Sequence, residues 1–217
     1  MDYLTQEDVF HAVDQVVEEL LEKRSMHTPP IDALTLAEKH FRATIRDPDR
    51  SELELQWESA QLIGKELKPR IYQRLGIDPT QRIRGPSIPN IFAKHLLLPT
   101  TWLRRDSAEL NYDLLALQEL YSSVSHEMLA FRWLDFPDPC IVTIIDNEEV
   151  YRRKSNGSSI KKELSVVEAE CLQIILEGDE PADARRAGWT VQGWPIPHEV
   201  WDRIILRSTV DPESFSD

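Results

Sequence analysis

Two adjacent residues, His126 and Glu127, have the types that begin a zinc-protease motif. The full motif is His-Glu-x-x-His on a helix. Residues four apart share a helix face, so both histidines reach one Zn²⁺ while the glutamate acts on the bound water. Here Ala130 occupies the position of the second histidine. The spacing therefore favours a simpler interpretation, a helix N-terminus led by Ser125 with Glu127 well placed against the helix dipole.

Other catalytic patterns are weak in this sequence. The six histidines are dispersed, so a zinc site built from His95, His126 and a nearby carboxylate stays open only as an alternative. No glycine-rich phosphate loop, serine elbow or Cys-His pairing is visible, and seven glycines leave little material for nucleotide-binding loops.

The composition indicates a folded protein that stays in the cytoplasm. The chain has 217 residues, 41% of them hydrophobic, with neither a long apolar run nor a signal-peptide pattern. Cys140 and Cys171 have no C-x-x-C spacing, which predicts free core thiols in a reducing compartment. The formal net charge of −13 repels polyanions, so nucleic acid is not an expected partner.

The first two thirds of the chain have the periodicity of helices. Apolar residues recur with helical spacing over residues 5–23, 31–41, 51–75 and 87–98, and in two further helices within 112–135. Thr5 followed by Asp8 has the form of a capping box, and Ser87 is expected to cap the fourth helix. Residues 43–45 are expected to form at most a short strand.

The pattern changes after residue 136. Residues 141–145 are a β-branched run, Asp146-Asn147 supplies a turn, and residues 149–153 can form a second strand that runs back along the first. This pattern predicts a β-hairpin. A polar loop is expected over 153–162 and a helix capped by Ser165 over 165–178. Residues 189–210, which mix tryptophans with β-branched residues, predict a final strand pair, or a strand and a helix.

Residues 90–103, "NIFAKHLLLPTTWL", resemble the A-N-x-F-A-x-x-L-L-M-P helix of the ImmA/IrrE family of metallopeptidase-like proteins. The flanking segments "LTLAEKHFRATI" and "DLLALQELYSSVSHEMLAFRWLDF" are similar to that family's leading helix and strand and its trailing helices. The resemblance covers most of residues 32–208, with a β-rich C-terminal extension like that of a subgroup. It implies a minimal zincin fold whose active members bind zinc and cleave proteins.

The resemblance places the family's zinc site on residues that cannot form one. The first two ligand positions fall on Gln61 and Lys65, the catalytic glutamate on Leu62 and the third ligand on Pro86. Glutamine is a poor zinc ligand, lysine repels the ion and leucine cannot accept a proton from water. Since His-x-x-x-His occurs nowhere in the chain, a shifted alignment does not restore the motif.

Two groups of residues near the C-terminus are candidates for binding a partner. Arg152, Arg153 and Lys154, with Lys161 and Lys162 beyond them, are the one basic concentration in an acidic chain. Trp194 lies between two further tryptophans, and tryptophans both anchor interfaces and fill small cores. The helices around "YSSVS" could also form a DNA-binding helix-turn-helix, but the apolar second helix favours core packing.

We therefore expect an α+β protein, with a mainly helical metallopeptidase-like (minimal zincin) domain and a reduced sheet, followed by a small C-terminal region containing a β-hairpin. The expected segments are an N-terminal helix (1–30), the peptidase-like domain (31–136), the β-containing region (137–208) and an acidic tail (209–217). The expected function is that of a pseudopeptidase without a cofactor, which binds a protein such as a transcriptional regulator. The alternatives are a zinc endopeptidase with displaced ligands and a DNA-associated regulator.

Overall fold

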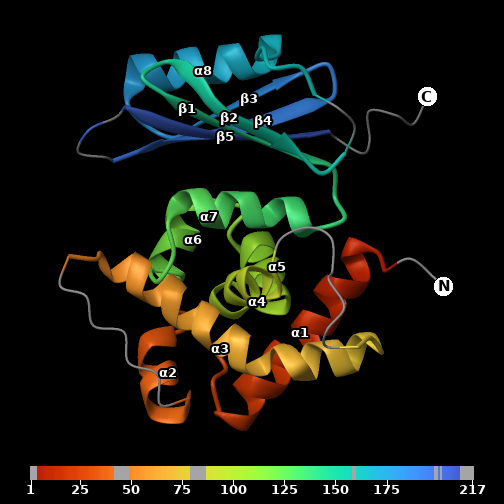
Figure 1. The fold of residues 1–217 in the computed structure, drawn as a ribbon. Helices are drawn as coiled ribbons and strands as arrows, with labels where there is room; N and C mark the ends of the chain where they lie inside the picture. The colour runs from red at the N-terminus through yellow and green to blue at the C-terminus, as the bar shows by residue number, and fades with distance from the viewer. Residues whose placement is uncertain are drawn as a thin grey trace. The chain divides into compact units, whose positions relative to one another are not determined.

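The computed structural model describes residues 4–41, 49–78, 87–157, 160–197, 200 and 202–210. The strand expected at 43–45 and the ligand position at Pro86 lie outside these residues. The chain divides into two compact units, Met1–Ser125 and His126–Asp217, which we call unit 1 and unit 2 (Figure 1). Helices and an antiparallel sheet confirm the α+β class. No described helix is long and apolar enough to cross a membrane.

All of the described secondary-structure elements of unit 1 are helices. They are α1 (Gln6–Lys23), α2 (Ala33–Phe41), α3 (Glu52–Leu75), α4 (Ile88–Leu97), α5 (Thr100–Glu109) and α6 (Leu114–Leu120). The long helix α3 packs against α1, α2 and α4. Capping boxes begin α1 at Thr5 and α3 at Ser51, and Gly76 ends α3 in the left-handed conformation.

Ser87 is the N-cap residue of α4, as expected, and Pro89 lies in the first turn, although the Ser87 side chain makes no capping hydrogen bond. The sequence pattern did not predict a helix over residues 100–109, where the structure has α5.

Unit 2 contains the sheet. Its elements are α7 (His126–Arg132), the short 3₁₀ helix η1 (Trp133–Asp135), β1 (Cys140–Asp146), β2 (Glu149–Ser155), α8 (Val166–Gly178), β3 (Ala182–Arg186), β4 (Trp189–Ile196) and β5 (Arg203–Val210). The strand order is β2-β1-β5-β4-β3, and every neighbouring pair is antiparallel. Helix α8 packs on one face of this sheet and α7 on the other (Figure 1).

The β1–β2 hairpin is present, as the sequence predicts, but its turn lies one residue later in the chain. The central turn residues are Asn147 and Glu148, whose φ values of 50° and 65° are those of a tight hairpin turn, rather than Asp146 and Asn147. Arg152 and Arg153 lie within strand β2, as the hairpin prediction implies, and β2 extends through Lys154 and Ser155 into the segment expected to be a polar loop.

The core of unit 2 lies between the sheet and α8. Val167, Cys171 and Ile175 of α8 are buried against residues of the central strands, including Val191 and Leu206. Both cysteines are buried and free, as expected, and burial raises the pKa of Cys140 to about 11 and that of Cys171 to about 12. They are packing residues rather than reactive thiols.

Helix α8 approaches β4 closely at Gly193. A Cβ added there would collide with Ile175 Cδ1 and would lie 2.7 Å from Leu206 Cδ2 and 3.1 Å from Cys171 Sγ. Three buried side chains would have to move together to accommodate it, so the sequence has glycine where the helix meets the strand.

We predict that Gly193→Ala lowers the free energy of unfolding by about 1–3 kcal/mol because it overpacks this contact. The control is Gly157→Ala, whose new Cβ would meet nothing closer than 3.6 Å. Urea unfolding followed by tryptophan fluorescence measures both. Equal stability of the two variants would contradict the close approach of α8.

Candidate functional site

The residues at the expected peptidase positions lie on the surface of α3. Gln61 and Leu62 are half-buried and Lys65 is exposed. Gln61 Nε2 donates a hydrogen bond to Asn90 Oδ1 of α4 at 2.8 Å. Gln61 and Lys65 share a face of the helix because they are four residues apart. Gln61 therefore contacts α4, and Lys65 is exposed on the same face of α3.

Close packing of α3 and α4 holds Gln61 and Asn90 in place. A Cβ at Gly64 would lie 3.0 Å from Phe92 Cβ and 3.1 Å from Pro89 Cα, so the small residue lets the two helices approach. The Phe92 side chain is fully buried beside it. The segment that carries the family resemblance is therefore a packing element of unit 1.

The histidines considered as zinc ligands have other surroundings. His95 is buried in unit 1, where its Nδ1 lies 2.7 Å from Asp14 Oδ1, and Thr100 donates to the same oxygen at 2.7 Å. His126 belongs to unit 2, and burial lowers its pKa. Within the described ranges, no three His, Cys, Asp or Glu side chains converge as a metal site would require.

A second candidate site is a surface that we call the hairpin face, formed by Phe131, Tyr151, Arg152 and Lys154. The Arg152 guanidinium lies 5.7 Å from the Phe131 ring centroid and 5.3 Å from that of Tyr151, while Lys154 Nζ lies 5.0 Å from the Phe131 centroid. Arg152 also pairs with Glu127 of α7. Tyr151 is 57% exposed, so Arg152 lies beside an accessible aromatic ring, whereas Lys154 lies over the half-buried Phe131.

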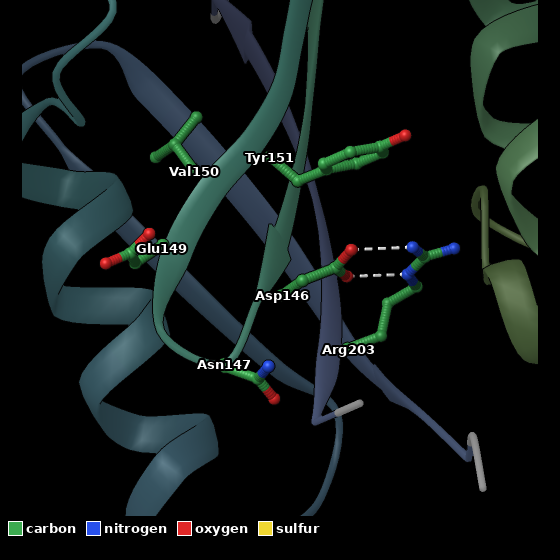
Figure 2. Close-up of a pocket in the computed structure, with 6 residues that line it drawn as sticks. All are labelled: Asp146, Asn147, Glu149, Val150, Tyr151 and Arg203. Atoms are coloured by element: carbon green, nitrogen blue, oxygen red, sulfur yellow. Dashed lines mark hydrogen bonds and ion pairs between the residues drawn. The ribbon is translucent and has the colours of Figure 1, made fainter. Parts of the chain in front are cut away.

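Beside the hairpin face is a cavity of about 510 Å³ at the end of the hairpin (Figure 2). Its lining residues are Asp146, Asn147, Glu149, Val150, Tyr151 and Arg203. Arg203 donates from Nε and Nη2 to the two Asp146 carboxylate oxygens at 2.7 Å each, and this pairing raises the pKa of Arg203. The guanidinium and the carboxylate thus form a bidentate pair in the wall of the cavity, next to the hairpin face.

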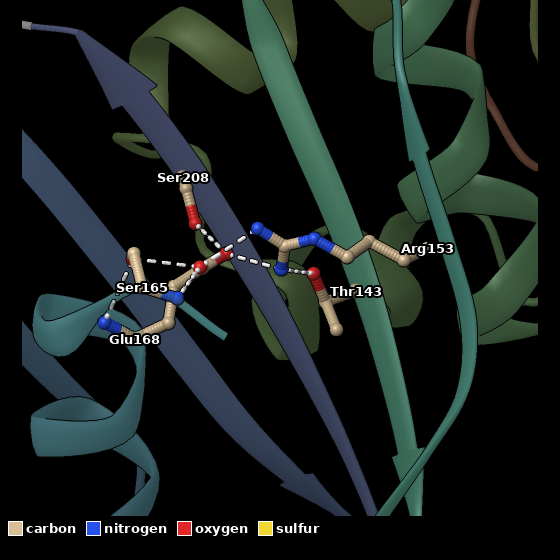
Figure 3. Close-up of polar contacts among 5 residues, drawn as sticks. All are labelled: Thr143, Arg153, Ser165, Glu168 and Ser208. Carbon is tan, nitrogen blue, oxygen red and sulfur yellow. Dashed lines mark hydrogen bonds and ion pairs between the residues drawn. The ribbon is translucent and has the colours of Figure 1, made fainter. Parts of the chain in front are cut away.

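Two of the residues proposed from the sequence for partner binding are internal. Arg153 is buried and donates from Nη1 and Nη2 to the Glu168 carboxylate of α8 at 2.7 and 2.8 Å, and from Nη1 to Thr143 Oγ1 at 2.6 Å (Figure 3). Trp194 is also buried, with its ring centroid 6.0 Å from that of Trp133. Arg152 and Lys154 lie on the surface of unit 2, which leaves them as the candidates for a contact.

Glu168 is the centre of this buried network. Besides Arg153, the Ser208 hydroxyl donates to it at 2.8 Å, and the Ser165 amide and hydroxyl donate at 2.8 and 2.7 Å. Burial raises its pKa, but the hydrogen bonds from Arg153, Ser165 and Ser208 outweigh burial and leave the pKa below its ordinary value of 4.5. The carboxylate is therefore charged and fully coordinated at neutral pH.

Sequence analysis identified Ser165 as a helix cap but did not single out Glu168. The available signal was the S-x-x-E spacing of a capping box, which the structure contains at Ser165 and Glu168. The pairing of Glu168 with Arg153 leaves no signal in the sequence, because only the sheet register brings Thr143, Arg153 and Ser208 together.

Searches find no protein-family model that matches this chain and no curated protein with significant similarity to it. The resemblance to ImmA/IrrE proteins is one of short motifs, those quoted above.

We predict that Glu168→Gln lowers the free energy of unfolding at pH 7 by about 3 kcal/mol, because it leaves the Arg153 charge buried without its counterion. The control is Glu170→Gln on the same helix, whose ion pair with Arg186 is exposed and worth less than about 1 kcal/mol. Urea unfolding of the variants measures both values, and similar losses would contradict the central role of Glu168.

The same comparison has a defined pH dependence. Since folding lowers the pKa of Glu168, its contribution is complete above the ordinary value of 4.5 and is lost as the pH falls through the folded-state pKa. The stability difference between wild type and Glu168→Gln should therefore shrink below about pH 4.5.

Proposed function

We propose that this protein is a non-catalytic relative of the ImmA/IrrE metallopeptidases and that it acts by binding another protein. The observation that carries the proposal is the hydrogen bond between Gln61 and Asn90 at the position where the resemblance puts the first zinc ligand. This surface of α3 and α4 combines an amide pair with the exposed cation of Lys65. These groups are suited to packing and to polar contacts, and none of them is a good zinc ligand.

Retention of the helices that carry the resemblance supports a scaffold role. Gly64 and Phe92 keep α3 and α4 in close contact although the chemistry at Gln61, Leu62 and Lys65 differs from that of the peptidases. A fold that loses its reactive groups but keeps its packing can still present a surface to a partner. A transcriptional regulator is the first candidate partner, since active members of the family are associated with cleaving repressors.

The hairpin face is the proposed contact surface. Aromatic side chains and arginine are enriched at protein interfaces, and the hairpin face has the exposed Tyr151 ring beside Arg152. Arg152 is fixed by its pairing with Glu127 and its stacking on Phe131, so it loses little conformational entropy when a partner binds.

The test is capture from a nuclease-treated extract of the organism that encodes the protein. We predict that wild type and the control Lys161→Ala/Lys162→Ala, which changes two exposed cations, retain one common protein at full length. Arg152→Ala/Lys154→Ala should retain at least about tenfold less, a loss of about 1.4 kcal/mol or more.

Three outcomes would contradict the proposal. Equal capture by all three proteins would exclude the hairpin face. Cleavage of the captured protein that a chelator abolishes would establish the zinc-peptidase alternative. Capture that occurs only from a parallel extract left without nuclease treatment would favour the DNA-associated alternative.

A further inference from the structure

The sheet of unit 2 ends at two edge strands, β2 and β3. An edge strand has backbone N–H and C=O groups without a neighbouring strand, and these groups can bond to a strand of another molecule. In β2, Tyr151 has no partner in β1, and a bulge of this kind twists an edge away from further pairing. Strand β3 pairs with β4 in an unbroken register, and no other described strand lies beside it. The outer edge of β3 is thus the edge that is open to pairing.

The backbone groups of Asp183 and Arg185 point outward from this edge. Arg186 and Trp189 flank the two-residue turn between β3 and β4, so they form a hydrogen-bonded pair. Hydrogen-bonded and non-hydrogen-bonded pairs alternate along an antiparallel ladder. The N–H and C=O groups of Asp183 and Arg185 therefore point away from β4 and can bond to a further strand.

The side chains of Asp183 and Arg185 lie on the same face of the sheet. Ala184, between them, is buried in the core beneath α8, and Arg186 pairs with Glu170 of α8. Because side chains alternate along a strand, Asp183 and Arg185 point to the opposite face. Both are exposed, and among the described residues neither has an ion-pair partner. The edge thus offers one negative and one positive side chain with a single residue between them.

The order of these two charges makes the edge complementary to itself. In an antiparallel pair of two β3 strands centred on Ala184, Asp183 of each copy lies opposite Arg185 of the other, and their outward backbone groups form hydrogen-bonded pairs. A centre at Asp183 or at Arg185 would instead place like charges opposite each other, which is destabilising. The pairing centred on Ala184 is closed by a two-fold axis, whereas pairing of β3 with β2 of another copy would continue into a filament.

Helix α8 has an exposed aliphatic side chain near the same edge. Ile174 is 50% exposed and lies one helical turn after Glu170, the residue that pairs with Arg186 of β3. It is therefore on the flank of α8 that is nearest to β3. A second copy would bring its own α8 to that side of the sheet, so Ile174 would lie at the border of the contact.

We propose that the outer edge of β3 is the interface of a homodimer, in which two sheets join edge to edge through Asp183 and Arg185. This inference goes beyond the proposed function, because it concerns the opposite edge of the sheet from the hairpin face and stands without the family resemblance. The net charge of −13 repels a second copy at long range. At physiological ionic strength this repulsion is largely screened beyond about 8 Å, whereas the contact itself pairs opposite charges.

The test is analytical ultracentrifugation of the full-length protein at about 0.15 M salt. We predict that wild type dimerises with a Kd below about 100 μM. Asp183→Arg and Arg185→Asp each place like charges opposite each other, so each should raise the Kd at least about tenfold. The controls Glu163→Arg and Lys162→Asp make the same changes of net charge at exposed residues outside the sheet and should leave the Kd within about twofold of wild type.

The two edge variants should also restore the contact in each other. A mixed dimer of Asp183→Arg and Arg185→Asp chains has two arginines on one strand opposite two aspartates on the other, so a heterodimer should form with a Kd near that of wild type. The double variant Asp183→Arg/Arg185→Asp, which exchanges the two charges, should likewise dimerise as wild type does. Both positions are exposed, so matching circular dichroism spectra are expected for all variants.

Several results would overturn the inference. They are a wild type that stays monomeric at about 1 mM, a dimer that neither single reversal weakens, and a mixture of the two variants that forms no heterodimer. A monomer whose Asp183 and Arg185 amides are protected from hydrogen exchange would show that another segment of the same chain covers the edge instead.

Discussion

The arrangement of unit 2 depends on one buried carboxylate, that of Glu168. It accepts hydrogen bonds from β2 through Arg153, from β5 through Ser208 and from the N-cap of its own helix through Ser165. A charge in this position is costly unless it is fully paired, so the helix is confined to the one position at which all the partners reach it. Strand β2 has one extra residue opposite Ile144 and Ile145 of β1, which is a β-bulge. Beyond this bulge Arg153 pairs with Thr143, and its side chain points to the side of α8.

The two faces of β2 follow from the same register. Because alternate residues of a strand point to opposite faces, fixing Arg153 toward α8 directs Arg152 and Lys154 to the side of α7, where both stack on Phe131. One interior ion pair therefore directs the side chain of Arg153 to one face of the sheet and those of Arg152 and Lys154 to the other.

Local sequence rules predicted most of the helices and the first hairpin. The capping boxes at Thr5 and Ser165, the β-branched run of β1 and the glycine after α3 are all signals that act within a few residues. The final strand pair expected over residues 189–210 is present as β4 and β5, but β3 was missed. The turn between β3 and β4 is formed by Ala187 and Gly188, both with positive φ, and alanine is not a residue that indicates such a turn.

The orientation of the basic residues was beyond the reach of these rules. Arg152, Arg153 and Lys154 are neighbours in sequence and looked alike as a basic group, yet the side chain of Arg153 is 7% exposed and that of Arg152 is 41% exposed. The difference arises from Glu168, which lies 15 residues away, and from the bulge in β2 opposite Ile144 and Ile145. Trp194 is similar, because its burial against Trp133 depends on packing between distant segments. To identify which basic residues are accessible to a partner, the register of the sheet was needed as well as the sequence.

The proposal of a non-catalytic function rests on the surface of α3 and α4. Gln61 bonds to Asn90 and Lys65 is exposed nearby, so zinc would have to displace an existing hydrogen bond and bind beside a positive charge. The most direct test is the zinc content of tag-free protein purified without a chelator, measured by elemental analysis together with a circular dichroism spectrum. We expect folded protein with far less than about one zinc per chain. About one equivalent per chain, removable by a chelator and lost on substitution of His95 or His126, would contradict the non-catalytic account.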